Sequence, residues 1–273
     1  MTLLQIIVLS LIQGLTEFLP VSSSAHLILP SKLLSWPDQG LAFDVACHVG
    51  TLLAVVIYYR KRLVTAAGDF LSAFKTKRQT ENSMLCWYII LSTIPVCLAG
   101  LFLDKYIESV IRDQAVAVIA GTTIIFGLLL WCADWYASRK DRVLTLSNMG
   151  LKIALVVGLS QILAFIPGTS RSGITMTCAL FLGLSRRDAA DYSFLLSIPL
   201  ILAAGSYSGL KVIKTDVPVD YTALVLGIVL SFISAYLVIK LFLRFISSLG
   251  LWPFVIYRIL LGLVLVAVAC NLL

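Results

Sequence analysis

The sequence has few charged side chains, and this scarcity excludes a water-soluble globular fold. Of its 273 residues, 60% are hydrophobic and 13% are charged, against about 45–50% and about 25% in soluble domains. The mean hydropathy is +0.99. A compact domain with so few charges would lack a wettable surface. The composition therefore predicts an all-α protein that crosses a membrane several times.

Signatures of several other protein classes are also missing. The six cysteines occur within or beside apolar stretches without a CxxC motif or a Cys/His cluster, so we expect them to pack as small apolar side chains. The N-terminus has no basic region followed by a cleavage site, and we expect no removable signal peptide. The net charge of +7 comes from short basic groups between apolar runs, which predicts no nucleic-acid partner.

Six segments are long and apolar enough to cross a bilayer, which takes about 20 helical residues. The predicted spans are residues 42–59, 84–103, 115–135, 189–210, 221–241 and 252–272.

Two further apolar stretches, 3–30 and 151–183, are interrupted midway. The first is broken by Pro-Val-Ser-Ser-Ser from Pro20, and the second by Pro-Gly-Thr-Ser-Arg-Ser-Gly from Pro167. Proline disrupts a continuous helix, and irregular backbone at membrane depth is tolerated only inside protein or beside a wet cavity. Both stretches are therefore predicted to be re-entrant helix–loop–helix hairpins.

The loop charges predict an orientation. Segment 60–82 has six basic and two acidic residues, 136–152 has four and one, and 240–250 has two basic residues and no acidic one. Segments 104–113 and 211–220 are acidic or neutral. By the positive-inside rule the first set is cytoplasmic, so both termini and the entrance of the first hairpin lie outside. The second hairpin then enters from the cytoplasm.

The opposed hairpins indicate an inverted repeat within one membrane domain, 1–273. A shift of 147 residues aligns Phe18-Leu19-Pro20 with Phe165-Ile166-Pro167, and Asp44 with Asp191. The halves, about 1–135 and 150–273, would each contain a hairpin and three spans. Inverted repeats with broken helices place a polar site near the repeat interface.

The first hairpin carries a group of chemically capable side chains. Gln13 and Glu17 are four residues apart and share a helix face just before the break. A carboxylate inside a membrane segment is costly and indicates function. Ser22 and Ser23 follow the break, where serine also commonly caps a helix. His26 lies within one turn of Ser23, so imidazole and hydroxyl are expected to face the same cavity.

The second hairpin contributes groups suited to an anion. Arg171 is the fixed positive charge of its loop, and guanidinium binds phosphate at two points. Ser170, Ser172 and Thr175 surround it, beside backbone N–H groups at a helix start. A Glu, Ser, His and Arg together favour phosphoryl chemistry, with the carboxylate as base or metal ligand. The residues alone leave a transporter site as an equal alternative.

Other intramembrane polar residues have simpler interpretations. His48 lies inside the first full span, and packing is favoured over function for it. Asp44 and Asp191 lie near span starts, where a carboxylate favours the helix dipole. Arg258, about two turns into the last span, is expected to extend toward the cytoplasm.

Two long motifs give the sequence a family resemblance. QGLTEFLPVSSSAH at 13–26 and PGTSRSGIT at 167–175 resemble the signature regions of the bacterial undecaprenyl-diphosphatase family, also called bacitracin-resistance proteins. The resemblance extends over nearly the whole chain, including DYSFLLSIP at 191–199 and PFVIYR at 253–258. It implies a hydrolase of the bacterial inner membrane that converts undecaprenyl diphosphate to undecaprenyl phosphate. That reaction recycles the lipid carrier of peptidoglycan synthesis and confers bacitracin resistance, since the antibiotic captures the diphosphate.

The resemblance also assigns residues. It places the family's Glu/Gln-x-x-x-Glu motif on Gln13 and Glu17, its serine and histidine on Ser23 and His26, and its arginine on Arg171. It implies a divalent cation, Mg²⁺ or Ca²⁺, with Glu17 as a ligand. Glutamine at 13 removes one carboxylate, but Mg²⁺ often uses few protein ligands together with substrate phosphates. Whether Ser23 or His26 is the nucleophile stays open.

Three other functions compete with the hydrolase. Inverted repeats also suit a secondary transporter, but the Ser/His/Arg set exceeds what substrate binding requires. An acid phosphatase with two catalytic histidines would need the second histidine, His48, in a matching motif. A membrane scaffold needs no charge at membrane depth. The expected partners are the lipid-linked diphosphate and membrane lipid, and the sequence leaves open whether the chain forms a homodimer.

Overall fold

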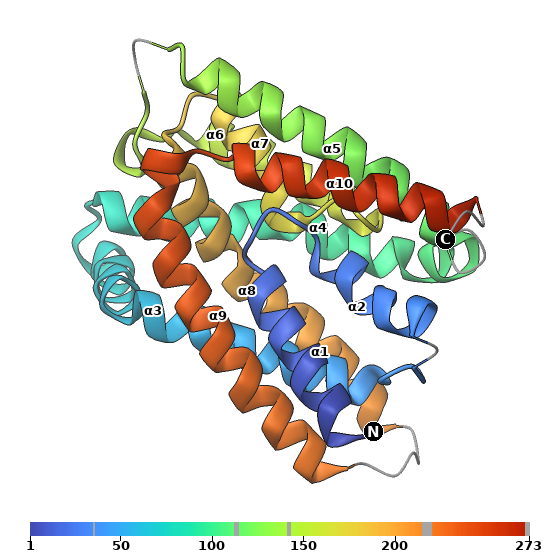
Figure 1. The fold of residues 1–273 in the computed structure, drawn as a ribbon. Coiled ribbons are helices and arrows are strands. Elements are labelled where there is room, and N and C mark those ends of the chain that lie inside the picture. Colours follow the sequence, from blue (N-terminus) through green and yellow to red (C-terminus); the bar gives the residue numbers. More distant parts are fainter. Residues whose placement is uncertain (35, 112–114, 141–142, 215–219, 271–273) are drawn as a thin grey trace.

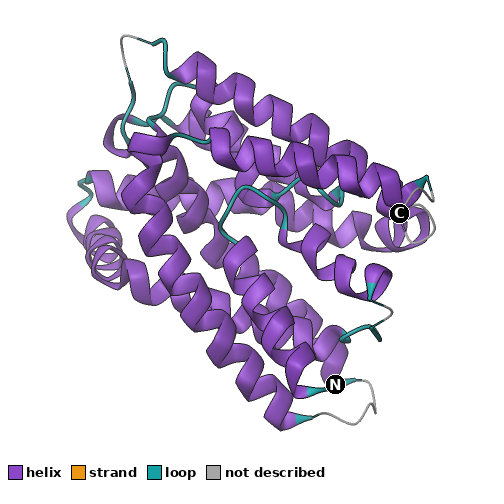
Figure 2. Cartoon of the chain, in the orientation of Figure 1, coloured by secondary structure: helices purple, strands orange, loops and turns teal. Residues whose placement is uncertain are grey.

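The computed structural model describes residues 1–34, 36–111, 115–140, 143–214 and 220–270. Within these ranges the side chains of 31–33, 104–111 and 115 are not described. The described chain forms ten α-helices and two short 3₁₀ helices, and it contains no β-strand apart from an isolated bridge (Figures 1 and 2). The all-α prediction is confirmed. The predicted end of the last span, 271–272, lies outside the described residues.

Six of the helices are long and apolar enough to cross a membrane, which confirms the six predicted spans. They are α3 (Leu41–Thr76), α4 (Glu81–Ile111), α5 (Ala115–Ala137), α8 (Arg186–Ile213), α9 (Tyr221–Leu249) and α10 (Trp252–Ala269). The first is longer than predicted, 36 residues instead of 42–59. Its charged second half continues the helix because nothing in 60–76 stops it before Lys77, which ends it in a left-handed conformation.

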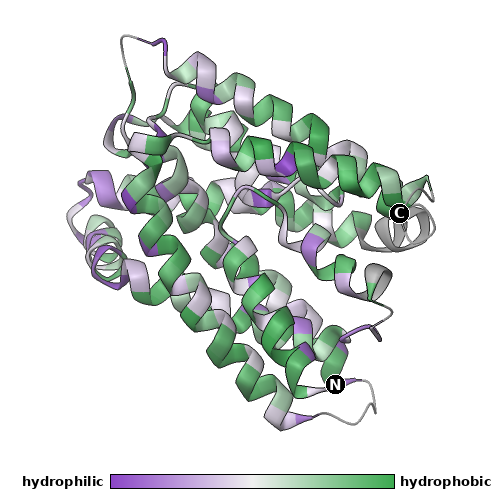
Figure 3. Ribbon diagram, viewed as in Figure 1, coloured by the Kyte–Doolittle hydropathy of each residue, from purple (hydrophilic) through white to green (hydrophobic). Residues whose placement is uncertain are grey.

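The outer surface of this bundle is apolar. Phe102 and Ile213 are each 81% exposed, although such side chains are normally buried in soluble proteins. Figure 3 shows hydrophobic residues along the long helices and hydrophilic ones gathered where α3 meets α4. Lipid tails are the solvent that suits such a surface, so the protein is a multi-pass membrane protein.

Both interrupted stretches form a helix, a loop and a second helix. The first consists of α1 (Leu3–Thr16) and α2 (Ser23–Leu33), and the second of α6 (Leu151–Ser160), the 3₁₀ helix η2 (Gln161–Phe165) and α7 (Arg171–Phe181). Each second helix follows a serine with positive φ, Ser22 at 73° and Ser170 at 69°. This conformation is strained for a residue with a Cβ, and strained backbone concentrates at functional sites.

The helices pack in two groups that meet around these loops (Figure 1). In one group, α9 contacts both α1 and α3, and α3 also contacts α8. In the other, α5 contacts α10 and α7, and α4 contacts α6. Helix α4 joins the groups through α3 and α8, and α7 contacts α8. Each interrupted stretch is thereby anchored by its first helix to a long helix of the opposite half of the chain.

Two glycines allow this anchoring. A Cβ on Gly14 of α1 would lie 2.6 Å from the carbonyl oxygen of Ser231 in α9. A Cβ on Gly158 of α6 would lie 2.5 Å from the carbonyl oxygen of Ser92 in α4. Small residues let membrane helices approach closely enough for dispersion and polar contacts to hold them. The positions of both loops therefore depend on these close crossings.

The expectation that Arg258 extends toward the cytoplasm is wrong. Its side chain is fully buried. Nε donates to the carbonyl oxygen of Thr123 at 3.1 Å, Nη1 to those of Pro20 and Thr169 at 3.1 and 3.0 Å, and Nη2 to that of Gly168 at 2.9 Å. The loop carbonyls lack helical partners, and the forked guanidinium satisfies several of them at once. Arg258 thus ties the two loops to each other and to α5.

Candidate active site

The site is centred on an ion pair between the two loops. Arg171 Nη2 lies 3.0 Å from Glu17 Oε1, and the side chains are only 12% and 8% exposed. The Glu17 carboxylate follows the end of α1, whereas Arg171 begins α7. Arg171 also donates from Nη1 to the carbonyl oxygen of Ser193 in α8 at 3.2 Å. The guanidinium is therefore held at two points in one orientation.

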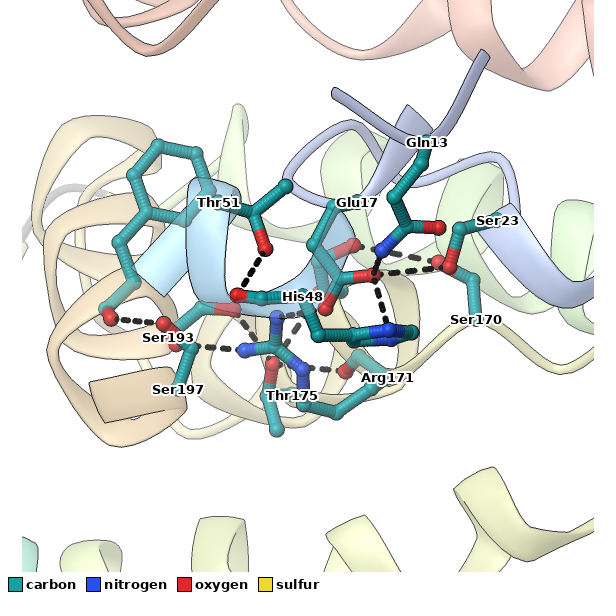
Figure 4. A network of polar contacts seen from close by, with 12 residues as sticks. Gln13, Glu17, Ser23, His48, Thr51, Ser170, Arg171, Thr175, Ser193 and Ser197 are labelled. Atoms are coloured by element: carbon teal, nitrogen blue, oxygen red, sulfur yellow. Dashed lines mark hydrogen bonds and ion pairs between the residues drawn. The ribbon is translucent and has the colours of Figure 1, made fainter. Parts of the chain in front are cut away.

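The other carboxylate oxygen of Glu17 accepts two further hydrogen bonds (Figure 4). Ser23 Oγ donates to Oε2 at 2.9 Å and Gln13 Nε2 at 3.0 Å. Gln13 Oε1, in contrast, is buried without a hydrogen-bond partner among the described residues. Gln13, Glu17, Ser23 and Arg171, four of the residues singled out in the sequence, thus form one network.

The hydroxyl groups of the second loop bond mainly within the protein. Ser170 Oγ accepts from the backbone N–H of Gly173 at 3.1 Å and so caps α7. Ser172 Oγ donates to the carbonyl oxygen of Leu19 at 2.8 Å, which joins the two loops. Thr175 Oγ1 lies 2.7 Å from Ser193 Oγ and also bonds to backbone carbonyls of its own helix. In this structure these hydroxyls shape the loops around Arg171.

A cavity of about 410 Å³ opens beside the ion pair. Its polar lining comprises Glu17, Asp44, His48, Gln161, Arg171 and Ser208. The remaining described lining is apolar and includes Val96, Phe165, Leu200 and Ile201. A lining that combines charged groups with apolar walls suits a ligand with a polar head and a hydrocarbon tail.

His26 does not join the network, contrary to the expectation that it shares a cavity with Ser23. Its Nδ1 lies 2.7 Å from the carbonyl oxygen of Ser22. Its Nε2 lies 2.5 Å from the hydroxyl oxygen of Tyr257 in α10, whose ring stacks on the imidazole. The described lining of the cavity includes neither Ser23 nor His26, nor Ser22, Ser170, Ser172 or Thr175.

Two lining residues are not among the predicted site residues. The sequence favours packing for His48, whereas in the structure it lines the cavity with its Nε2 3.8 Å from Glu17 Oε2. Gln161 is fully buried, and its Oε1 has no hydrogen-bond partner in the described part of the chain. A signal for Gln161 was present, because it lies 148 residues after Gln13, close to the shift that aligns the two halves.

The matching carboxylates Asp44 and Asp191 have different surroundings. Asp44 lines the cavity and accepts from Gln39 Nε2 at 3.0 Å. Asp191 is buried elsewhere, bound by the Tyr59 hydroxyl and, at 3.2 Å, by Arg187 Nε. Asp44 therefore belongs to the site, whereas Asp191 connects α8 to α3.

The donor set is compatible with a divalent cation that the substrate helps to bind. The described residues contain no group of three or more His, Cys, Asp or Glu side chains placed to hold a metal. Two carboxylates, Glu17 and Asp44, do line the cavity. Gln13, which is hydrogen-bonded to Glu17 through its Nε2, has an amide oxygen without a partner among the described residues. Mg²⁺ is commonly held by one or two carboxylates together with substrate phosphates.

Fold and site together define an integral membrane protein with a cavity that combines charged side chains and apolar walls. The family model described as "Bacitracin resistance protein BacA" matches residues 6–264. The chain belongs to that family. This match and the relatives described next confirm the resemblance found in the sequence.

Curated relatives resemble the chain over almost its entire length. "Undecaprenyl-diphosphatase 1" of Pseudoalteromonas translucida is 53% identical, over 97% of this chain and 98% of the relative. "Undecaprenyl-diphosphatase" of Teredinibacter turnerae is 52% identical over the same shares. The protein of that name from Saccharophagus degradans is 53% identical over 96% of each chain.

Proposed function

We propose that this protein is an undecaprenyl-diphosphatase that hydrolyses undecaprenyl diphosphate to undecaprenyl phosphate and inorganic phosphate. The observation that carries the proposal is the buried Glu17–Arg171 pair with Ser23 bound to the same carboxylate, beside a cavity with apolar walls. The names and identity of the curated relatives support it. Its role in the cell is then to recycle the lipid carrier of cell-wall synthesis, and bacitracin resistance follows from removal of the diphosphate.

In the proposed mechanism Arg171 holds the terminal phosphate and Ser23 attacks it. The guanidinium is already oriented by Ser193, so it can exchange its bond to Glu17 for phosphate oxygens. Ser23 Oγ forms a bond to the terminal phosphorus, and its proton moves to Glu17 Oε2, 2.9 Å away. The anhydride bond to the bridging oxygen breaks, and its electron pair leaves with undecaprenyl phosphate. Water then hydrolyses the phosphoserine, Ser23 recovers its proton from Glu17, and inorganic phosphate is released.

The remaining predicted site residues have supporting roles in this proposal. Gln13 orients Glu17 through its Nε2. His26 fixes the strained Ser22 through its carbonyl group and is itself held by Tyr257, so Ser23 is favoured over His26 as nucleophile. Ser170, Ser172 and Thr175 place the N–H groups at the start of α7 and Arg171 where phosphate oxygens bind.

A divalent cation, Mg²⁺ or Ca²⁺, completes the proposal. Glu17 and Asp44 would hold it together with the phosphates of the substrate. When bound, it supplies positive charge that neutralises the phosphate oxygens.

The direct test is a phosphate-release assay on the purified protein with a long-chain prenyl diphosphate. We expect turnover that a chelator abolishes and added Mg²⁺ or Ca²⁺ restores. If no phosphate is released with cation present, the proposed hydrolase activity is wrong. Release that persists undiminished in chelator would remove the cation from the proposal.

We further propose that the interrupted stretches are re-entrant hairpins within an inverted repeat, with halves of about 1–135 and 150–273. The helix order supports this, since α1–α5 and α6–α10 each comprise two short helices followed by three long ones. The short helices start 148 residues apart, at Leu3 and Leu151 and at Ser23 and Arg171. Ser22 and Ser170 also share an unusual backbone conformation, with ψ of 97° and 113°.

The proposed location is the bacterial inner membrane, with the active site open to the periplasm. The basic segments 60–82 and 136–152 support a cytoplasmic position for one end of the bundle. Pro37 and Lys77 flank α3, a helix of 36 residues or about 54 Å. In this proposal they lie on opposite sides of the membrane, with Pro37 on the side of the first hairpin's ends.

Cysteine labelling tests this orientation. Single cysteines replace Ser24, Pro37 or Lys77 in a background without the six native cysteines, and intact cells are treated with an impermeant thiol reagent. We expect labelling at positions 24 and 37, and labelling at position 77 only after the membrane is permeabilised. The opposite pattern at 37 and 77 would place the mouth of the site in the cytoplasm.

A further inference from the structure

The side chain of His48 has a defined orientation in the cavity. Its Nδ1 lies 2.7 Å from the carbonyl oxygen of Asp44, one helical turn earlier. A carbonyl oxygen can only accept, so Nδ1 carries a proton and, in the neutral ring, Nε2 carries the lone pair. Nε2 has no hydrogen-bond partner among the described residues. The side chain is 37% exposed and lines the cavity.

Of the two histidines, His48 is the one with a ring nitrogen, Nε2, that makes no hydrogen bond to the described residues. The sequence contains two histidines. Both ring nitrogens of His26 are engaged, by Ser22 and Tyr257. His48 leaves one nitrogen directed toward Glu17 Oε2 at 3.8 Å, and Ser23 Oγ lies 2.9 Å from the same oxygen. The imidazole and the hydroxyl therefore both contact one carboxylate oxygen (Figure 4).

The proposed two-step reaction needs a second base at this place. In the first step Glu17 takes the proton of Ser23, and in the second it must return that proton to the departing Ser23 oxygen. Glu17 is therefore protonated when water attacks and cannot accept the proton of that water. Arg171 and Gln13 are donors toward the site, and the proposed function assigns the Asp44 carboxylate to the cation.

We propose that His48 is the catalytic base of the second step, an inference that rests on the proposed function. The water oxygen forms a bond to the phosphoserine phosphorus, and one water proton moves to His48 Nε2. The bond between phosphorus and Ser23 Oγ breaks, and its electron pair takes the proton held by Glu17. Inorganic phosphate leaves, and His48 gives its proton to solvent through the open cavity. A general base in this position contributes about 100-fold to the rate.

The test compares His48→Gln with the wild-type protein, using a long-chain prenyl diphosphate with a radiolabelled terminal phosphate. We expect kcat to fall about 100-fold and KM to fall by a similar factor, so that kcat/KM is nearly unchanged, because binding and the first step do not use the base. Labelled phosphate should stay on the variant chain after an acid quench, since only the second step is slowed. Thr65→Ala is the matched control, because Thr65 is exposed on the same helix and bonds to its own backbone.

His48→Ala provides an independent measurement. Added imidazole should restore phosphate release from this variant and remove the retained label from the chain. This rescue is expected if the imidazole replaces a missing base, and it is not expected if the variant is only poorly packed. A kcat of His48→Gln within threefold of wild type overturns the proposal, and so does a lower kcat without retained label or an Ala variant that imidazole does not rescue. If the wild-type protein itself releases no phosphate, the proposed function fails instead, so the two failures are distinguishable.

Discussion

Arg171→Lys is expected to lower kcat/KM at least about 100-fold although the positive charge is kept, which corresponds to about 2.7 kcal/mol of transition-state stabilisation. Arg171 uses two different nitrogens, Nη2 for Glu17 and Nη1 for the carbonyl oxygen of Ser193. A lysine ammonium is a single point of charge and cannot hold Ser193 while binding two phosphate oxygens. The measurement is phosphate release across a range of substrate concentrations.

Arg60→Lys is the matched control for that substitution. Arg60 is exposed on α3 and bonds only to its own helix through Nη1 and the carbonyl oxygen of Ile57 in the described structure. Its replacement should leave kcat/KM unchanged. If Arg171→Lys retains activity within about threefold, or about 0.7 kcal/mol, Arg171 does not clamp the phosphate.

Glu17→Gln is expected to reduce turnover at least about 1,000-fold, in the range reported for loss of a nucleophile's general base. The substitution preserves the shape of the side chain, and an amide oxygen can still accept from Ser23 and Gln13. An amide cannot take the proton of Ser23, however, and it is a far weaker ligand for a divalent cation. The same change leaves the buried Arg171 guanidinium without its counter-charge.

Two observations separate this catalytic effect from unfolding. The variant should elute as a single species in detergent, like the wild type, because the hydrogen bonds of Arg258 and Ser172 hold the loops without Glu17. Glu81→Gln, at an exposed position in the first turn of α4, should have normal activity. Near-normal turnover of Glu17→Gln would exclude Glu17 as both base and cation ligand.

Much of the fold was predictable because the bilayer imposes simple rules on sequence. Long apolar runs gave the six spans, and proline followed by hydroxyl residues gave the two helix breaks. The same rules indicated that Glu17 and Arg171 belong together, since charges at membrane depth require partners. Their contact joins residues 154 positions apart in the chain. The signal for it in the sequence is that both are charged side chains within apolar segments.

The remainder depended on three-dimensional packing. His26 and His48 are both single histidines in apolar surroundings, and only the crossing of helices decides which one meets Tyr257 and which one faces the cavity. Arg258 was misjudged because a long side chain near a span end usually reaches the aqueous interface. Its actual partners are backbone carbonyls in three other segments. Every residue has a backbone carbonyl, so the sequence does not show which of them accept from Arg258.

The contacts of Arg258 have a consequence for how the protein is made. The ribosome delivers the chain from its N-terminus, so Glu17, Ser23 and Arg171 enter the membrane well before α10 (Trp252–Ala269) is synthesised. Until then the carbonyl groups of Pro20, Gly168 and Thr169 lack the guanidinium that joins them in the finished protein. The active centre is consequently among the last parts to mature. A chain stalled before its final helix contains the whole Glu17–Ser23–Arg171 set and is still an unfinished enzyme, because polar backbone groups of both loops remain unpaired.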